Sequence, residues 1–212
     1  MCGIIGLLAR TTELRSTLGR MLVPMFRCMA ERGPDSAGLA VFREPPASSR
    51  RKVSLHARRT GYDFAGLEQR MRAELDPGAL LRTSANGAVV EIDVAAAPLR
   101  AWISENAPEL TVLSVGRAIE LFKDQGRPED VLAKYEFVGM TGSRAVGPTR
   151  MATESAVSPA HAHPFTAGED FCLVHNGSLS NPYKLRRRLE AEGVRFETDN
   201  DSEAACRYLE FY

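Results

Sequence analysis

Residues 2–9 read Cys-Gly-Ile-Ile-Gly-Leu-Leu-Ala, a short apolar run that begins directly after Met1. The run has too little polar alternation for a half-exposed strand, so it predicts a buried strand at the start of the chain. If Met1 is removed, Cys2 carries both a thiol and a free α-amine. The amine titrates near ~7.7–8.0 and the thiol near ~8.5, so the amine can serve as base for the thiol. Cys2 is therefore either an N-terminal nucleophile or, the commoner case for a lone cysteine, a core residue.

The sequence after this run predicts a helix and a second strand. Apolar residues recur at helical spacing from Leu14 to Met29, with a kink expected at Pro24. Residues 31–35, Glu-Arg-Gly-Pro-Asp, end that helix, and Ala37–Phe42 follows as a short strand.

The middle of the chain, about 44–140, has a different character and no motif of its own. It opens on a polar connector containing Pro45 and Pro46. It then predicts helices at 64–75, 115–125 and 128–135 and a strand at 88–94. We interpret this stretch as a small α+β insertion.

The last stretch returns to unusual residues. A strand is predicted at Glu169–His175 and runs into Asn176-Gly177. Asn181-Pro182 should start a helix that ends near Gly193, and a final helix should begin at Asp201.

Composition excludes several classes of protein. The 212 residues include 27 Lys plus Arg and 27 Asp plus Glu, which argues against a nucleic-acid or anionic-membrane binder driven by net charge. No apolar run approaches the ~20 residues that span a bilayer, and no secretory signal is recognisable. Four cysteines without tight spacing predict neither a disulfide framework nor a zinc site. The expected protein is cytoplasmic and uses no metal.

Three further elements could carry chemistry, although each has an ordinary structural explanation. Asn176 and the N–H of Gly177 could stabilise an oxyanion, but Asn-Gly is also the strongest hairpin signal. Arg150, with Thr153, could bind a carboxylate, or Arg150 could be solvated. Asp201 could bind an ammonium group or cap the last helix.

These elements are stronger evidence for a function together than singly, because they belong to a series of motifs in a fixed order along the chain. The sequence motifs, taken together, are Cys2-Gly-Ile-Ile-Gly6, Arg32-Gly-Pro-Asp-Ser-Ala-Gly38, Thr149-Arg-Met-Ala-Thr153, Ala162-His-Pro-Phe165, His175-Asn-Gly177 and Asp201-Ser-Glu203. In this order they resemble the class II glutamine amidotransferase domain of the N-terminal-nucleophile hydrolases. The resemblance covers roughly 1–43 and 141–212 but not the middle.

The resemblance implies a fold and a role for each motif. The fold would be α+β, a four-layer αββα sandwich with the insertion at one edge. Cys2 would be the nucleophile, and Asn176 with Gly177 would form the oxyanion hole. The glutamine α-carboxylate would bind Arg150, assisted by Thr153, and the α-ammonium would bind Asp201. Arg32 and Gly33 would shape the pocket, while His163 would organise its loop.

The resemblance also implies an activity: hydrolysis of the L-glutamine side-chain amide through a Cys2 thioester, without a cofactor. The ammonia would pass to a synthase partner, and neither nucleic acid nor membrane would be involved. Met151 and Glu154 replace the Trp or Phe and the His of many relatives. The Met151 form, together with the insertion, makes the chain look most similar to stand-alone amidotransferase subunits of glutamate-synthase-like and N-methylglutamate-synthase-like complexes.

Two alternatives remain open from the sequence. The chain could be an inactive assembly or regulatory subunit, or an amidohydrolase acting on another amide.

An insertion of about 95 residues leaves few for the core, so a single domain over 1–212, cut short within its last helix, is the expected organisation.

Overall fold

The computed structural model describes residues 2–46, 49–151 and 158–212. Its centre is an antiparallel four-stranded sheet in the order β1-β8-β2-β7. The strands are β1 (Gly3–Leu8), β8 (Arg144–Arg150), β2 (Ser36–Phe42) and β7 (Ile119–Gln125). Gly3 pairs with Thr149, so the beginning of β1 lies beside the end of β8. This register brings Cys2 and Arg150, 148 positions apart in the sequence, to the same end of two neighbouring strands.

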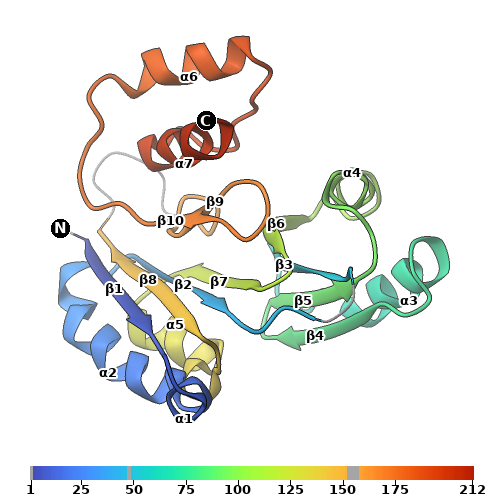
Figure 1. Cartoon of the computed structure of the whole chain (residues 1–212), viewed down its shortest axis with the longest axis horizontal. Coiled ribbons are helices and arrows are strands. Elements are labelled where there is room, and N and C mark those ends of the chain that lie inside the picture. The colour runs from blue at the N-terminus through green and yellow to red at the C-terminus, as the bar shows by residue number, and fades with distance from the viewer. Residues whose placement is uncertain (1, 47–48, 152–157) are drawn as a thin grey trace.

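Helices cover one face of this sheet (Figure 1). They are α1 (Thr12–Ser16), α2 (Leu18–Met29) and α5 (Pro128–Lys134), with the short 3₁₀ turns η1 (Ala30–Arg32) and η2 (Phe137–Gly139). The single helix predicted from Leu14 to Met29 is thus two helices, which meet at Thr17. Leu18, Leu22 and Phe26 of α2 are fully buried against the sheet. Burial of side chains of this size stabilises the fold by roughly 1.5–3 kcal/mol each.

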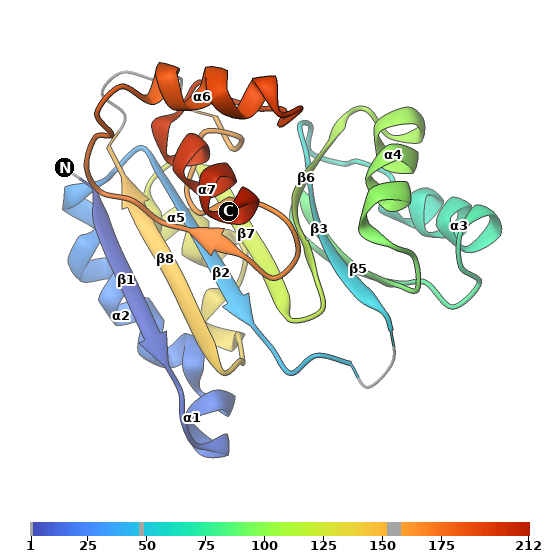
Figure 2. The same ribbon diagram turned by 45° about the horizontal axis from the view of Figure 1, so that its top comes forward.

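The opposite face carries the C-terminal part of the chain (Figure 2). A two-stranded sheet, β9 (Phe165–Thr166) with β10 (Cys172–Leu173), lies between the four-stranded sheet and the helices α6 (Pro182–Ala191) and α7 (Asp201–Phe211). The predicted four-layer αββα sandwich is therefore confirmed. Asn181 caps α6 as expected, whereas α7 is capped by Asn200 and not by Asp201. The strand predicted at 169–175 is paired only at Cys172–Leu173.

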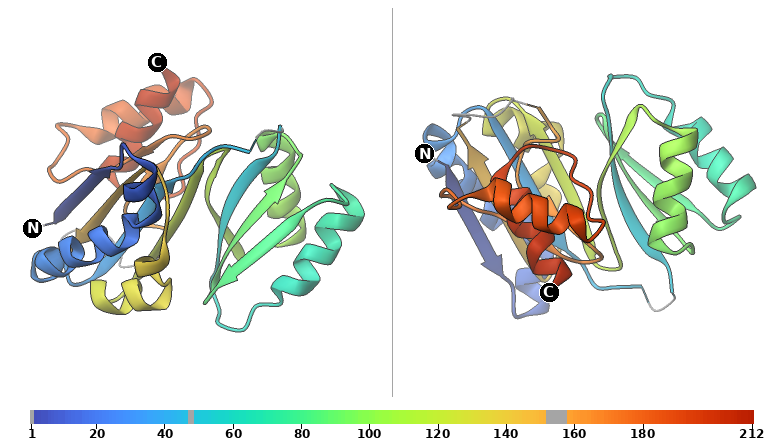
Figure 3. Two further views of the ribbon diagram at one scale, coloured as in Figure 1. Left: turned by 60° about the horizontal axis from the view of Figure 1, so that its bottom comes forward. Right: turned by 90° about the horizontal axis from the view of Figure 1, so that it is seen from above.

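A second four-stranded sheet stands beside the first, in the order β4-β5-β3-β6 (Figure 3). It comprises β3 (Arg51–Ala57), β4 (Leu80–Ser84), β5 (Gly87–Ile92) and β6 (Leu110–Gly116). Helices α3 (Phe64–Glu74) and α4 (Ala96–Asn106) cover its outer face. We call residues 51–116 the second-sheet unit.

The second-sheet unit is shorter than the stretch 44–140 that the sequence suggested. Ile119–Gln125, where a helix was predicted, is strand β7 of the central sheet, and α5 packs on that sheet as well. The helix predicted at 115–125 was wrong because the charged residues of β7, which suggested a solvated helix face, are buried in the strand.

A buried acid on β7 joins the two sheets. Glu120 is fully buried and forms ion pairs with Lys52 Nζ at 3.1 Å, Arg82 Nη2 at 2.9 Å and Arg43 Nε at 2.9 Å. Burial alone would raise the pKa of Glu120, but the three cations hold it below its ordinary value. Since Lys52 and Arg82 come from the second-sheet unit and Glu120 from β7, these pairs fix the unit on the core.

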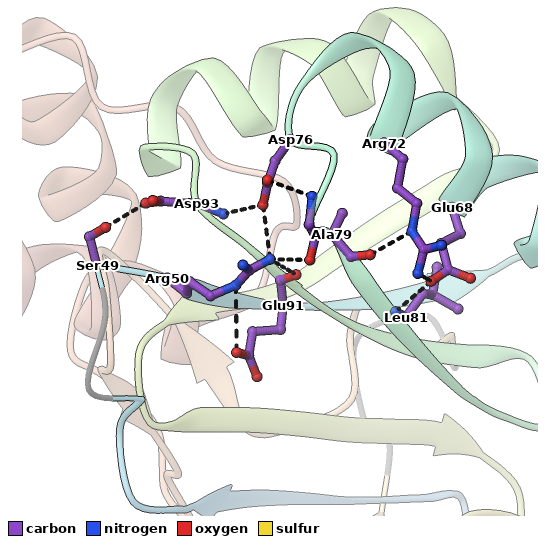
Figure 4. A network of polar contacts seen from close by, with 10 residues as sticks. Ser49, Arg50, Glu68, Arg72, Asp76, Ala79, Leu81, Glu91 and Asp93 are labelled. Atoms are coloured by element: carbon purple, nitrogen blue, oxygen red, sulfur yellow. Dashed lines mark hydrogen bonds and ion pairs between the residues drawn. The ribbon is translucent and has the colours of Figure 1, made fainter.

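A polar network also fixes the second-sheet unit internally (Figure 4). The carboxylate of Asp76 accepts hydrogen bonds from the N–H groups of Asp93 at 3.0 Å and Gly78 at 2.8 Å, and it pairs with Arg50 at 2.9 Å. The two backbone donors lower the pKa of Asp76. The network ties the loop after α3 to the end of β5.

Strand β1 differs from its prediction as a buried strand. It is an edge strand of the central sheet, and Ile4 and Leu8 are 43% and 59% exposed. Only the alternate residues face α2, so the apolar run 2–9 is half-exposed despite its composition.

Among the described residues, no helix is long and apolar enough to cross a membrane.

Candidate active site

A cleft of about 480 Å³ opens where the start of β1 and the end of β8 meet the C-terminal segments. Its walls come from five separate parts of the chain. The lining residues are Cys2, Arg150, Met151, His163, His175, Asn176, Gly177, Ser178, Leu179, Pro182, Tyr183, Asp199, Asn200, Asp201 and Ser202. The cleft therefore brings together five of the eight residues that the sequence singled out.

Cys2 is partly buried at the mouth of the cleft. Its Sγ lies 3.9 Å from the carbonyl oxygen of Met151, and its own carbonyl oxygen accepts a hydrogen bond from Asn176 Nδ2 at 3.0 Å. Gly3 follows in tight packing, since a Cβ there would lie 2.9 Å from both Met29 Cβ and Thr149 Oγ1. Cys2 thus lies between Met151, next to its thiol, and the Asn176 side chain, which binds its backbone carbonyl.

The Asn176-Gly177 turn is supported from behind by His175. The His175 ring contacts Ser202 through Nδ1, 3.1 Å from Oγ, and a Cβ on Gly177 would lie 2.9 Å from His175 Nε2. A side chain at position 177 would therefore displace the imidazole. These contacts orient the turn towards Cys2, to which Asn176 is already hydrogen-bonded.

Two opposite charges line the same cleft. Arg150, at the end of β8, is only 5% exposed, and this burial lowers its pKa, an effect opposed by Cys2, Asp35 and Asp199. Asp201, in the first turn of α7, accepts a hydrogen bond from the N–H of Leu179 at 2.9 Å. A guanidinium and a carboxylate held in place by separate elements can bind the two ends of a zwitterion.

The other predicted site residues lie elsewhere. Gly33 is buried behind Arg150, and a Cβ on it would lie 2.4 Å from both Arg150 N and Thr149 C. Arg32 is exposed at the end of η1 and does not line the cleft. Thr153 and Glu154 lie outside the residues that the structure describes.

His163 and Tyr183 line the cleft although neither was assigned a place in it from the sequence. His163 is buried, and burial, together with the nearby cations Lys123 and Arg150, lowers its pKa to about 3, so its imidazole is neutral at pH 7. Tyr183 belongs to the first turn of α6. A signal for Tyr183 was present, because a helix that begins so soon after Asn176-Gly177 must start near the same cleft.

The fit of Gly33 against β8 gives a testable prediction. We expect Gly33→Ala to lower the free energy of unfolding by about 1–3 kcal/mol, because the added methyl group meets backbone atoms that cannot turn away. Gly6→Ala is the matched control, since a Cβ at position 6 meets no atom within 4 Å. Urea denaturation of both variants measures the difference. Equal midpoints would show that the backbone around Arg150 accommodates the methyl group.

The chain is similar in sequence to several known proteins. Residues 149–211 match the family model described as "Glutamine amidotransferase domain". The chain is 44% identical over 210 residues to the glutamine amidotransferase-like protein GlxB of Rhizobium meliloti (strain 1021), covering 99% of this chain and 69% of that protein. It is also 34% identical over 112 residues, 53% of this chain, to the glutamine–fructose-6-phosphate aminotransferase of Acidithiobacillus ferridurans, of which the match covers 17%.

The α+β sandwich and these similarities place the chain in the class of glutamine amidotransferase domains. With the similarity to GlxB extending over nearly the whole chain, this protein belongs to the glutamine amidotransferase family.

Proposed function

We propose that this chain is the glutaminase component of an amidotransferase. It would hydrolyse the side-chain amide of L-glutamine and deliver ammonia to a synthase partner. The observation that carries the proposal is the convergence of Cys2, Asn176, Arg150 and Asp201 on one cleft from separate elements of the fold. None of these residues is diagnostic alone, but a nucleophile, an oxyanion donor and two opposite charges in one cleft match the groups of glutamine.

The reaction would begin at Cys2 after Met1 is removed. The free α-amine takes the thiol proton, and the thiolate attacks the carboxamide carbon of glutamine. The developing oxyanion is stabilised by Asn176 Nδ2 and the N–H of Gly177. When the tetrahedral intermediate collapses, the C–N bond breaks and ammonia leaves with the proton that the α-amine carried. Water then hydrolyses the γ-glutamyl thioester, which releases glutamate and restores the thiol.

The hydrogen bond between Asn176 and the Cys2 carbonyl supports this assignment. The bond holds the amide donor of Asn176 against the backbone of the residue that carries the thiol, before substrate binds. The donor can then serve an oxyanion with little rearrangement, and preorganised donors of this kind supply about 2.7–4 kcal/mol in acyl transfer.

Substrate selection would rest on Arg150 and Asp201. The buried guanidinium binds the α-carboxylate and the Asp201 carboxylate binds the α-ammonium, so the two ends of the amino acid are read at once. Thr153 would assist Arg150, and Gly33 would hold the Arg150 backbone in position. Arg32 would act only indirectly, from outside the cleft.

The ammonia acceptor would be a synthase subunit, as in glutamate-synthase-like or N-methylglutamate-synthase-like complexes, and the complex would be cytoplasmic. The relative from Acidithiobacillus ferridurans is named as a glutamine–fructose-6-phosphate aminotransferase, which supports the role of glutamine as nitrogen donor.

The state of the N-terminus provides the test. We expect protein whose intact mass shows loss of Met1 to release equimolar glutamate and ammonia from glutamine. The same chain carrying an N-terminal tag keeps the Cys2 nitrogen in an amide bond and should be inactive, since an amide nitrogen cannot accept the thiol proton. An inactive untagged chain with a free Cys2 amine would favour a non-enzymatic subunit. Hydrolysis of another amide, with glutamine left intact, would instead identify a different amidohydrolase.

A further inference from the structure

One chain segment forms two walls of the cleft. Residues 160–177, which we call the cleft wall, contain His163 near one end, the strands β9 and β10, and His175-Asn176-Gly177 at the other end. Both ends line the cleft, so the position of this segment sets the shape of the site. The question is what fixes the segment on the rest of the fold.

Lys123 fixes the end that contains His163. Its Nζ donates to the carbonyl oxygens of Ala162 at 2.8 Å, Pro164 at 3.2 Å and Ala160 at 3.4 Å. The ammonium group also lies 5.1 Å from the ring centroid of Phe165, a cation–π distance. Because Ala162 and Pro164 flank His163, one side chain from β7 holds the backbone on both sides of it.

The Lys123 charge is maintained at a cost in folding free energy. The residue is only 5% exposed, and burial lowers its pKa to about 8. In the described part of the chain, no carboxylate lies within ion-pair distance of Nζ; Glu197 and Glu203 act on it only from further away. A buried cation without a direct counter-ion is disfavoured relative to an apolar side chain of the same shape. We therefore attribute the presence of a lysine at this position to its contacts with the cleft wall.

Asp170 fixes the turn between β9 and β10. Its carboxylate accepts hydrogen bonds from three consecutive N–H groups, those of Arg117 at 2.9 Å, Ala118 at 2.7 Å and Ile119 at 2.9 Å. A Cβ on Gly116 would lie 2.3 Å from Asp170 Oδ1, so the residue before these donors must be glycine for the aspartate to fit. These donors form the connection between β6 and β7.

A second contact reinforces this attachment. Arg51 Nε lies 3.0 Å and 2.9 Å from the two carboxylate oxygens of Glu169. Arg51 begins β3, and β3 is paired with β6 in the second-sheet unit. The cleft wall is thus attached to the central sheet through Lys123, to the second-sheet unit through Glu169, and to the connection between β6 and β7 through Asp170.

We propose that β7 and the connection that joins it to β6 position the cleft wall for catalysis, with Lys123 on β7 and Asp170 on the cleft wall as positioning residues, and thereby couple the second-sheet unit to the active site. The inference rests on the proposed glutaminase function for its kinetic consequences but not for its structural ones. It assigns the second-sheet unit a role in the geometry of the site, although that unit contributes no residue to the cleft lining.

Lys123→Met and Asp170→Asn test the proposal, with Lys184→Met and Asp130→Asn as exposed controls. We expect amide hydrogen exchange over residues 160–177 to accelerate about tenfold or more in both test variants, while exchange in α2 stays unchanged. Both should lower kcat/KM for glutamine about tenfold, since small misplacements of catalytic groups have effects of this size or larger. In Asp170→Asn most of the loss should fall on kcat, because the Asn176-Gly177 end acts on the transition state.

The outcomes separate the two proposals. Unchanged exchange over 160–177 in both variants, or an equal acceleration throughout the chain, overturns the positioning role whatever the activity. Accelerated exchange confined to 160–177 with unchanged kcat/KM in an active enzyme also overturns it, because the positions would then not matter to catalysis. If the wild-type protein does not hydrolyse glutamine, the proposed function fails, and local exchange alone decides whether β7 and the β6–β7 connection hold the cleft wall.

Discussion

Replacing Cys2 by alanine should reduce glutamine hydrolysis by at least about 1,000-fold, the largest effect expected of any single substitution in this chain. The variant keeps the α-amine, the Asn176-Gly177 turn and both charged groups of the cleft. It loses only the atom that forms the thioester, so the remaining activity measures what binding and the oxyanion donors achieve without a nucleophile. Release of glutamate, followed after the intact mass has confirmed loss of Met1, is the measurement.

The matched control for this substitution is Cys28→Ala. Cys28 is an exposed free thiol on α2 outside the cleft, so its removal should leave the rate unchanged. Cys172 and Cys206 are poorer controls, because each packs in an apolar cluster, Cys172 against Ile119 and Leu121 and Cys206 with Phe165, and their replacement would disturb packing. Full activity in Cys2→Ala would exclude the thioester mechanism and with it the assignment of Cys2 as nucleophile.

The sequence allowed the site to be predicted better than the architecture around it. Cys2, Asn176, Gly177, Arg150 and Asp201 all line one cleft, as their order along the chain suggested. Their proximity could be predicted because each motif joins a chemical group to a local backbone signal: a strand start, an Asn-Gly dipeptide, the end of a strand and the first turn of a helix. The roles of these residues stay a prediction.

The boundaries of the second-sheet unit could not be predicted in the same way. Strand β7 reads Ile-Glu-Leu-Phe-Lys-Asp-Gln, and three of its charged side chains, those of Glu120, Lys123 and Asp124, are buried. Charged residues at these positions indicate an exposed helix face when only local periodicity is considered. Their partners lie in the second-sheet unit, in the cleft wall and in α5, and such long-range pairing leaves no local pattern.

Arg150→Met should raise the KM for glutamine by roughly 30-fold to several thousand-fold. Removal of one partner from a buried, hydrogen-bonded charge pair costs about 2–5 kcal/mol, and each 1.4 kcal/mol is about tenfold in affinity. Arg150 is 5% exposed, so water cannot replace the guanidinium at the α-carboxylate. Asp201→Asn should raise KM less, since the asparagine oxygen can still accept the N–H of Leu179 and only the charge is lost.

Two substrate analogues can show which end of glutamine each residue binds. 4-Aminobutanamide lacks the α-carboxylate and glutaramate lacks the α-ammonium, while both retain the amide that Cys2 would attack. If Arg150 binds the carboxylate, Arg150→Met loses its effect on 4-aminobutanamide and keeps it on glutaramate; Asp201→Asn should show the reverse. This crossed pattern isolates a pairwise interaction from a general loss of structure, because a misfolded cleft would impair both analogues equally. Equal losses on both would mean that Arg150 and Asp201 support the cleft without contacting the ends of the substrate.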